Sequence, residues 1–207
     1  MSSKSKIKGS SFEREVAKYL SDLYGESFIR NISGSGAFIG GKNFHRASTL
    51  TDSQILSTRG DIYCPESFAN LNIECKSYAN FAWHQLFDES KQLETWINQL
   101  MTVSDTYSLN MLCFKITRQG RYIAVPAKVS IIHHQRQKTG MFIDINHMTY
   151  TTKYHGVWFI YPFESFLISY KDTVALLSIK TQTENTTSTS CELIEEAPQH
   201  SKHNQTL

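Results

Sequence analysis

Two carboxylates and an ammonium group occur in this chain at a spacing that suits phosphate chemistry. Asp61 follows Gly60, and Glu74-Cys75-Lys76 comes thirteen residues later. Because successive side chains of a strand point to opposite faces, Glu74 and Lys76 would share one face. If the runs around Asp61 and Glu74 pair as a hairpin, the side chain of Asp61 would lie beside those of Glu74 and Lys76. Mg²⁺ usually takes one or two carboxylates together with substrate phosphate, and Lys76 could then hold the attacking water or the phosphate.

The same residues also have an ordinary structural interpretation. Alternating Glu and Lys is common on exposed strands, and an aspartate after a glycine is common in turns. Whether so short a motif as Glu-x-Lys is catalytic or structural therefore depends on the rest of the chain.

The elements that must position these carboxylates are predicted in the order α-β-β-β-α. Apolar residues recur at helical spacing from Phe12 to Leu23, and Gly25 follows, which predicts an amphipathic helix with a glycine stop. A Gly- and Ser-rich loop and a long segment up to Arg59 separate the first strand from the aspartate. The predicted core elements are a helix over 10–25, strands over 27–32, 61–64 and 70–78, and a helix over 83–105.

After this core, the sequence predicts a hairpin that turns at Gln119-Gly120 and a short helix that begins at Pro162. The three tryptophans fall at amphipathic positions and are predicted to be core residues rather than base-stacking platforms. The predicted strands of this part cover 109–116, 121–125 and 156–161, and the helix covers 162–167.

Composition separates a folded part from a polar tail. The chain has 207 residues, with 21 Lys and Arg against 19 Asp and Glu. From Thr181 onward it is rich in Thr, Ser, Asn and Gln with almost no apolar run, which predicts a disordered tail over 181–207. The tail carries a net charge of −3, so the rest carries +5. A modest basic surface suits a polyanionic partner and equally suits ordinary solvation.

Targeting signals and cysteine usage indicate the compartment. No apolar run follows Lys4, Lys6 and Lys8 as a secretory signal requires, and none is long enough to span a membrane. The four cysteines include no C-x-x-C pair, which predicts small core residues in a reducing compartment. We expect a cytoplasmic protein with one folded domain over 10–180, preceded by a flexible basic N-terminus over 1–9.

Four short blocks stand in order along the chain: Lys8-Gly9-Ser10-Ser11-Phe12-Glu13-Arg14-Glu15, Phe28-Ile29-Arg30 with Ser33-Gly34-Ser35, Gly60-Asp61, and Ile73-Glu74-Cys75-Lys76. Taken together, they resemble the archaeal-type Holliday-junction resolvases, a family of the PD-(D/E)xK nuclease superfamily. The likeness covers roughly residues 8–127. It implies an α/β fold with a restriction-endonuclease-like αβββαβ core, in which a central mixed sheet is flanked by helices.

The resemblance implies roles for particular residues. Asp61 and Glu74 would bind the metal, with the backbone carbonyl of Cys75 as a further oxygen ligand. Glu13, on the first helix, would be a third acid of the metal site, directly or through water. Lys76 would orient the attacking water. The implied catalytic set is Glu13, Asp61, Glu74 and Lys76.

DNA contacts are implied at residues outside this set. Arg14, Arg30 and Lys115 match basic positions that act near the DNA backbone in the family. Backbone N–H groups around Ser35, in a Gly-Ser-Gly loop, could also bind a phosphate. The predicted DNA-binding set is Lys8, Arg14, Arg30, Ser35, Lys42, Arg46 and Lys115.

The implied activity is Mg²⁺-dependent hydrolysis of DNA phosphodiesters, with Mn²⁺ able to substitute, leaving 5′-phosphate and 3′-hydroxyl ends. The implied partners are branched or duplex DNA and a second copy of the chain, because paired nicks across a junction need two related sites. No membrane partner is expected. Since bacteriophages often carry diverged nucleases, the expected setting is the cytoplasm of a bacterial or archaeal cell or of a phage-infected host.

Two departures from the resolvase pattern leave other functions open. The segment 37–59 is inserted before Asp61, and about eighty residues follow the shared core. The insertion carries Lys42, His45 and Arg46, which could clamp DNA or change the substrate. The alternatives are a general or restriction-like nuclease or nickase, and a catalytically inactive DNA-binding or inhibitory module.

Overall fold

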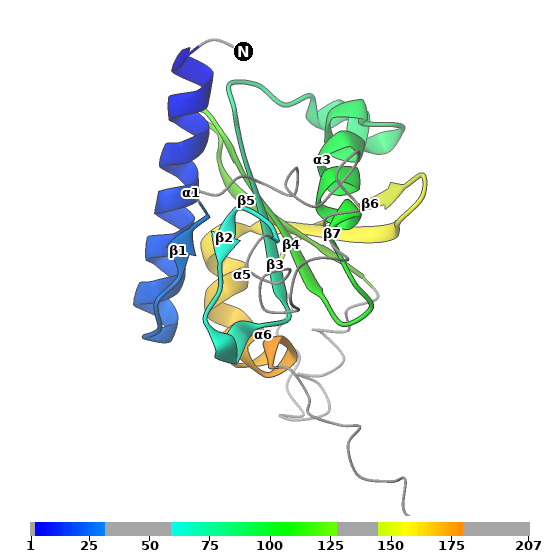
Figure 1. Cartoon of the computed structure of the whole chain (residues 1–207). Helices are drawn as coiled ribbons and strands as arrows, with labels where there is room; N and C mark the ends of the chain where they lie inside the picture. Colours follow the sequence, from blue (N-terminus) through cyan, green and yellow to red (C-terminus); the bar gives the residue numbers. More distant parts are fainter. Residues whose placement is uncertain (1–2, 32–58, 128–144, 180–207) are drawn as a thin grey trace, which may run out of the picture.

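A five-stranded mixed sheet forms the centre of the fold (Figure 1). The computed structural model describes residues 3–31, 59–127 and 145–179. The strands of the sheet are β3 (Leu71–Tyr78), β4 (Leu109–Ile116), β5 (Gly120–Pro126), β6 (Met148–Thr152) and β7 (Gly156–Pro162). Their order is β3-β4-β5-β7-β6, so β3 lies at one edge. The predicted mixed sheet flanked by helices is confirmed.

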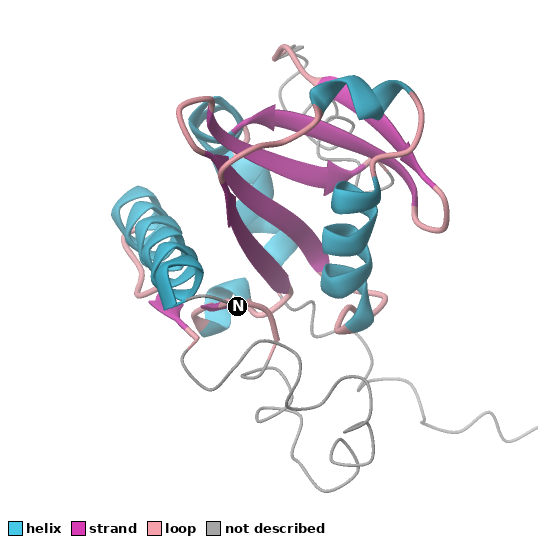
Figure 2. Ribbon diagram, turned by 90° about the horizontal axis from the view of Figure 1, so that it is seen from above, coloured by secondary structure: helices cyan, strands magenta, loops and turns pink. Residues whose placement is uncertain are grey.

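Helices cover both faces of this sheet. On one face, α1 (Ser3–Tyr24), α5 (Phe163–Ser169) and α6 (Lys171–Ser178) share an apolar core with β3 and β4. On the other face, α3 (Lys91–Thr102) packs against β4, β5 and β7. Figure 2 shows α1 and α3 on opposite sides of the strands. The predicted apolar stripe of the first helix contributes Phe12, Val16 and Leu20, each 1% exposed, to the core.

The strands β3 and β4 run parallel, and α3 connects them. Their register pairs Leu71 with Leu109 and Tyr78 with Ile116. The predicted hairpin of β4 and β5 is confirmed, and its turn contains Arg118 at φ 62° and Gly120 at φ 135°. The parallel pairing leaves the other edge of β3 facing the segment that carries Asp61.

The strand after Asp61 does not form the expected hairpin with β3. Instead β2 (Ile62–Tyr63) pairs antiparallel with β1 (Ile29–Arg30), in a separate two-stranded sheet. Pro65 follows two residues after β2 and has no N–H to donate to a ladder. The chain then turns through the 3₁₀ helix η3 (Glu66–Phe68) before β3 begins.

Other elements differ from the prediction in their bounds. The first helix begins at Ser3 rather than Ser10. The helix expected over 83–105 is divided into the 3₁₀ helix η4 (Trp83–Phe87) and α3, because Ser90 caps α3 by accepting a hydrogen bond from the N–H of Leu93 at 3.4 Å. Neither β6 nor α6 was predicted. The insertion 37–58 and the tail 181–207 lie outside the described residues.

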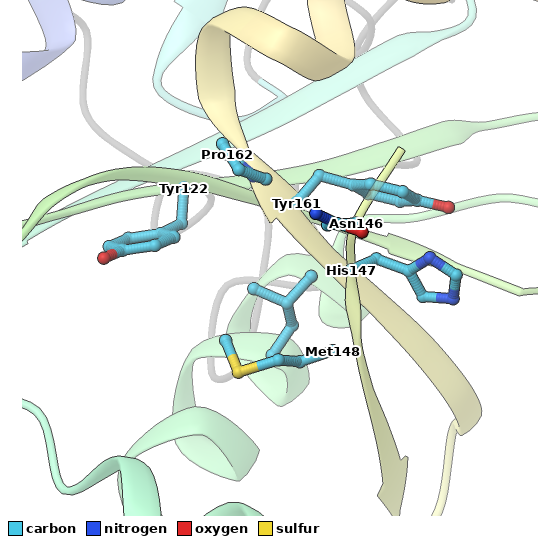
Figure 3. A pocket seen from close by; sticks show the side chains of 7 residues that line it. Tyr122, Asn146, His147, Met148, Tyr161 and Pro162 are labelled. Atoms are coloured by element: carbon cyan, nitrogen blue, oxygen red, sulfur yellow. The ribbon is translucent and has the colours of Figure 1, made fainter. Parts of the chain in front are cut away.

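A cavity of about 180 Å³ lies where β5, β6 and β7 meet (Figure 3). Tyr122, His147, Met148 and Tyr161 are among the residues that line it, and none of the predicted site residues in the described part of the chain does. Within the described part of the chain, no helix is long and apolar enough to cross a membrane.

Candidate active site

Asp61 is fixed at the free edge of β3 by both its backbone and its side chain. Its N–H donates to the carbonyl of Ile73 at 2.8 Å, and its own carbonyl accepts from the N–H of Asn31 at 2.8 Å. Its Oδ2 accepts from the N–H of Cys75 at 2.8 Å. Asp61 therefore does meet the Glu74 strand, as predicted, although it does so through single hydrogen bonds rather than a hairpin ladder.

The glycine before Asp61 allows this close approach. Gly60 has φ 58°, and a Cβ on it would lie 2.3 Å from the carbonyl oxygen of Ile73. The carbonyl of Gly60 accepts a hydrogen bond from Nδ2 of Asn31 at 3.1 Å. Only a residue without a side chain can hold the chain this close to β3 in this conformation.

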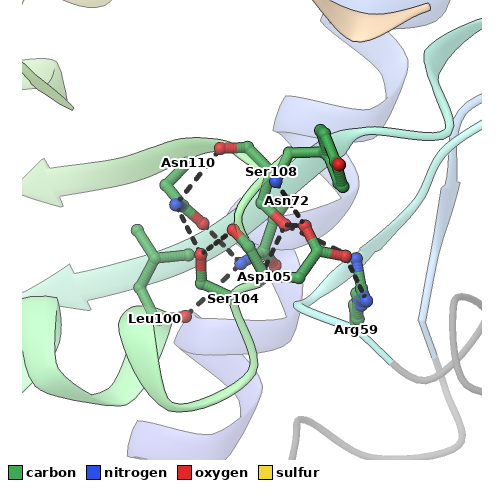
Figure 4. A network of polar contacts seen from close by, with 8 residues as sticks. Arg59, Asn72, Leu100, Ser104, Asp105, Ser108 and Asn110 are labelled. Atoms are coloured by element: carbon green, nitrogen blue, oxygen red, sulfur yellow. Dashed lines mark hydrogen bonds and ion pairs between the residues drawn. The ribbon is translucent and has the colours of Figure 1, made fainter. Parts of the chain in front are cut away.

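A polar network continues from this turn toward the start of β4 (Figure 4). Arg59 forms an ion pair with Asp105 at 2.6 Å and donates to Oγ of Ser108 at 3.4 Å. Beside it, Nδ2 of Asn72 donates to Oδ1 of Asn110 at 2.8 Å. These contacts tie the turn before Asp61 to the loop between α3 and β4.

Glu74 and Lys76 share the face of β3 that packs toward α3. The ammonium of Lys76 lies 2.5 Å from Oε1 of Glu74 and 2.7 Å from Oε1 of Gln99 on α3. Glu74 is only 2% exposed, and the side chain of Lys76 is 15% exposed. The predicted same-face placement is confirmed. Two oxygen acceptors, one on a strand and one on a helix, thus hold the ammonium of Lys76 in place.

The environment of the two carboxylates opposes their ionisation. Burial, followed by the charge of Glu74, raises the pKa of Asp61 to about 7, although the N–H of Cys75 acts in the opposite direction. Burial also raises the pKa of Glu74, against the lowering effect of Lys76. Both carboxylates feel the charge of Glu13 as well. A divalent cation between them would relieve this repulsion.

The oxygen donors at this edge suit Mg²⁺. In a strand, the N–H and C=O of one residue point to the same side. Since the N–H of Cys75 faces Asp61, its carbonyl lies on the same edge as the Asp61 carboxylate, and Glu74 is the next residue before Cys75. Two carboxylates and a carbonyl, completed by water and phosphate, are a usual ligand set for this ion.

The third predicted acid is engaged by a basic residue. Glu13, on α1, forms an ion pair with Arg30 of β1. Within the described residues, no group of three or more His, Cys, Asp and Glu side chains is arranged to hold a metal ion. The residues at this edge that could hold a metal are Asp61, Glu74 and, through its carbonyl, Cys75.

The predicted DNA-binding residues are placed separately. Lys115 forms an ion pair with Glu15 of α1 at 2.8 Å and lies over the ring of Phe12, with its Nζ 5.9 Å from the ring centroid. Arg14 is exposed and donates to Oγ of Ser10 at 3.2 Å. Arg30 pairs with Glu13. The other four members fall where side chains are not described, since Lys8 lies in the first turns of α1 and Ser35, Lys42 and Arg46 lie outside the described residues.

Two residues of the site were not predicted. Gln99 contacts Lys76, and Asn31 holds both Gly60 and Asp61. An exposed glutamine on an amphipathic helix has the appearance of an ordinary surface residue. Only its position after Arg30 could suggest a role for Asn31. The sequence therefore held no clear signal for Gln99 or Asn31.

A family model matches most of this sequence. Residues 4–175 match the model of the family described as "Phage putative PDDEXK endonuclease". No curated protein and no solved structure matches this sequence. The match spans most of the chain and includes Glu13, Asp61, Glu74 and Lys76. The chain therefore belongs to this phage PD-(D/E)xK endonuclease family.

Proposed function

We propose that this chain is a Mg²⁺-dependent endonuclease that cuts branched DNA, with four-way junctions as its preferred substrate. The observation that carries the proposal is the hydrogen bond from Cys75 to Asp61, which brings the aspartate to the edge of β3 beside Glu74. Membership of a phage endonuclease family supports the nuclease activity. The resolvase-like blocks in the first 35 residues support the junction preference.

Each residue has a distinct task in this reaction. Asp61, Glu74 and the carbonyl of Cys75 would hold a divalent cation, Mg²⁺ or Mn²⁺, which supplies charge stabilisation for the phosphate and lowers the pKa of a bound water. Lys76 lies beside Glu74 and carries a positive charge that orients the attacking water or stabilises the charge developing on the phosphate.

Two chains would act together on a junction. Paired nicks on opposite strands require two equivalent sites, which a two-fold homodimer provides. A phage family suits action in the cytoplasm of an infected host. Sedimentation of the purified chain with and without a junction tests the dimer.

The first experiment compares an end-labelled four-way junction with a linear duplex of the same sequence. Each is incubated with Mg²⁺ or with a chelator, using the wild-type chain, Glu74→Ala and Asp61→Asn. The matched control is Glu66→Ala, an exposed glutamate in η3. We expect paired nicks in the junction that need Mg²⁺, no nicks with either site variant, retained DNA binding, and normal cutting by the control.

Other outcomes would replace this proposal with one of its alternatives. Equal cutting of junction and duplex would indicate a general nuclease or nickase. Binding without cutting under any condition would indicate an inactive DNA-binding module. Full cutting by Glu74→Ala would show that the chemistry lies elsewhere in the chain.

A further inference from the structure

We propose that Tyr78 is a stacking site for an unpaired nucleobase next to the phosphate that is cut. This inference rests on the proposed nuclease function, because it places the base relative to Lys76. It assigns the enzyme a single-stranded or branch-point segment of DNA as the substrate class.

Tyr78 lies on the same face of β3 as the catalytic pair. Glu74, Lys76 and Tyr78 alternate with buried residues of the opposite face along the strand. The helix α3 confirms this, because Lys76 contacts Gln99 and Tyr78 contacts Trp96, one helical turn away. Two strand residues span about 6.6 Å, so Tyr78 is the next side chain after Lys76 on this face of the strand.

The ring of Tyr78 is partly open to solvent and is supported by an aromatic neighbour. It is 41% exposed at the end of β3. Its inner side packs on Trp96, with ring centroids 4.9 Å apart. Trp96 is 3% exposed and packs in turn on Phe81 and Phe114.

The backbone of Tyr78 is fixed as well. Its carbonyl accepts hydrogen bonds from the N–H of Thr117 at 3.0 Å and from the Thr117 hydroxyl at 3.2 Å. A ring held this firmly loses little conformational freedom when a base stacks on it, so the contact is favourable for any base.

A base within an intact duplex has both faces covered by its neighbours. Only an unpaired base can offer a free face to Tyr78, which connects the ring to branched or single-stranded DNA. Among the exposed tyrosines, Tyr107 is not placed to do this. Tyr107, 75% exposed, precedes β4 at the opposite end of the β3–β4 pair.

The test measures binding of two fluorescein-labelled probes, oligothymidine and a blunt duplex of equal length, in a chelator that prevents cutting. The variants are Tyr78→Ala, Tyr78→Leu, Tyr78→Phe and, as the matched control, Tyr107→Ala. Tyr78→Leu keeps an apolar contact with Trp96 but removes the aromatic face, so it remains informative if Tyr78→Ala unfolds. Urea unfolding of each variant records its stability.

We expect the Ala and Leu variants to bind oligothymidine about tenfold more weakly, with little change on the duplex. Tyr78→Phe and Tyr107→Ala should bind like the wild-type chain. In addition, the fluorescence of 2-aminopurine placed beside a junction branch should be quenched by the wild-type and Phe chains and not by the Leu variant.

Three results would overturn the stacking site: equal losses on both probes, no loss on either, or a loss with Tyr78→Phe as large as with Tyr78→Leu. The two proposals fail separately. Selective loss of oligothymidine binding in a chain that cuts nothing upholds stacking and refutes the nuclease. Cutting that is accompanied by unchanged binding in every Tyr78 variant upholds the nuclease and refutes stacking.

Discussion

The backbone N–H of Cys75 donates to Oδ2 of Asp61 at 2.8 Å and joins the two halves of the motif. The aspartate is thirteen residues before Glu74 in sequence and directly precedes the first strand of a separate small sheet, yet it is placed by the strand that carries Glu74 and Lys76. Any change that moves the Asp61 turn relative to β3 should therefore affect the chemistry before it affects the core.

Gly60→Ala should separate that turn from β3. The added Cβ would meet the carbonyl of Ile73 at 2.3 Å, in a backbone conformation with φ 58° that alanine adopts at a cost. We expect the free energy of unfolding to fall by about 1–3 kcal/mol and junction cutting to be lost in protein that is still folded. Urea unfolding and cleavage at low temperature measure the two effects.

Gly25→Ala is the matched control for this change. Gly25 has φ 73°, but a Cβ there would have no atom within 4 Å. It should therefore show only the backbone cost, about 1 kcal/mol, with full cutting. Equal activity of the two alanine variants would contradict the proposed role of Gly60 in placing Asp61.

The stability of the metal-free chain should depend on the protonation of Asp61. Its pKa is raised by burial from 3.8 to about 7 in the folded chain, so the folded state binds the proton more tightly than the unfolded state. This contribution to stability is fully present below pH 3.8 and is lost as the pH rises to about 7. Unfolding in urea at a series of pH values in chelator measures it.

Asp61→Asn removes the titrating group from this experiment. The fall in stability between pH 4 and pH 7 should become shallower in the variant, because the side-chain amide of asparagine does not titrate in this range. An identical pH dependence in both chains would show that the fall comes from other groups.

Elements with a clear periodic pattern of apolar residues were predictable from the sequence. The stripe from Phe12 to Leu20 and the hairpin at Gly120 each carry a strong local pattern, and both are present. By contrast, β6 reads Met-Thr-Tyr-Thr-Thr, with only Tyr150 and Thr152 buried, because it is an edge strand. Such a segment has too few apolar residues to be recognised alone.

The candidate site was predictable in its residue types but not in its contacts. Asp61, Glu74 and Lys76 could be chosen because carboxylates and an ammonium at this spacing suit one reaction. The pairing of Glu13 with Arg30 depends on how α1 lies against β1, which is a tertiary relationship without a local signal. The same holds for the hairpin considered between the Asp61 strand and β3, because that strand pairs with β1 instead.

Lys115→Met tests whether Lys115 stabilises the fold through its ion pair with Glu15 or contacts the DNA backbone. The ammonium lies 2.8 Å from Glu15, and both side chains are more than one third exposed. Because Glu15 already balances this charge, we expect the salt dependence of DNA binding to stay unchanged. A double-mutant cycle with Glu15→Gln should give a coupling of about 0.2–1 kcal/mol in unfolding.

Glu15→Gln alone provides the converse measurement. It frees the ammonium of Lys115, so the dependence of log K on log salt should become steeper. If instead Lys115→Met reduces that slope by about one, the lysine contacts a phosphate and leaves Glu15 when DNA binds.

Gln99→Leu should slow the chemical step through Lys76 while leaving the chain folded. Oε1 of Gln99 accepts from the Lys76 ammonium at 2.7 Å, so the ammonium is shared between Gln99 and Glu74. Without this acceptor, Glu74 alone would hold Lys76, and the ammonium would meet the substrate less often. Single-turnover cutting of a junction should slow by about tenfold, the effect of one misdirected group, with unchanged DNA affinity.

Gln99→Glu tests whether Gln99 positions the Lys76 ammonium for the reaction or only contacts it. A second carboxylate beside Lys76 would hold the ammonium more strongly than the amide does, so cutting should be slower than with the wild-type chain even though the hydrogen bond remains possible. Thr95→Ala, one turn earlier on the exposed side of α3, is the matched control and should cut normally. Normal rates with both Gln99 variants would mean that Glu74 alone aims Lys76.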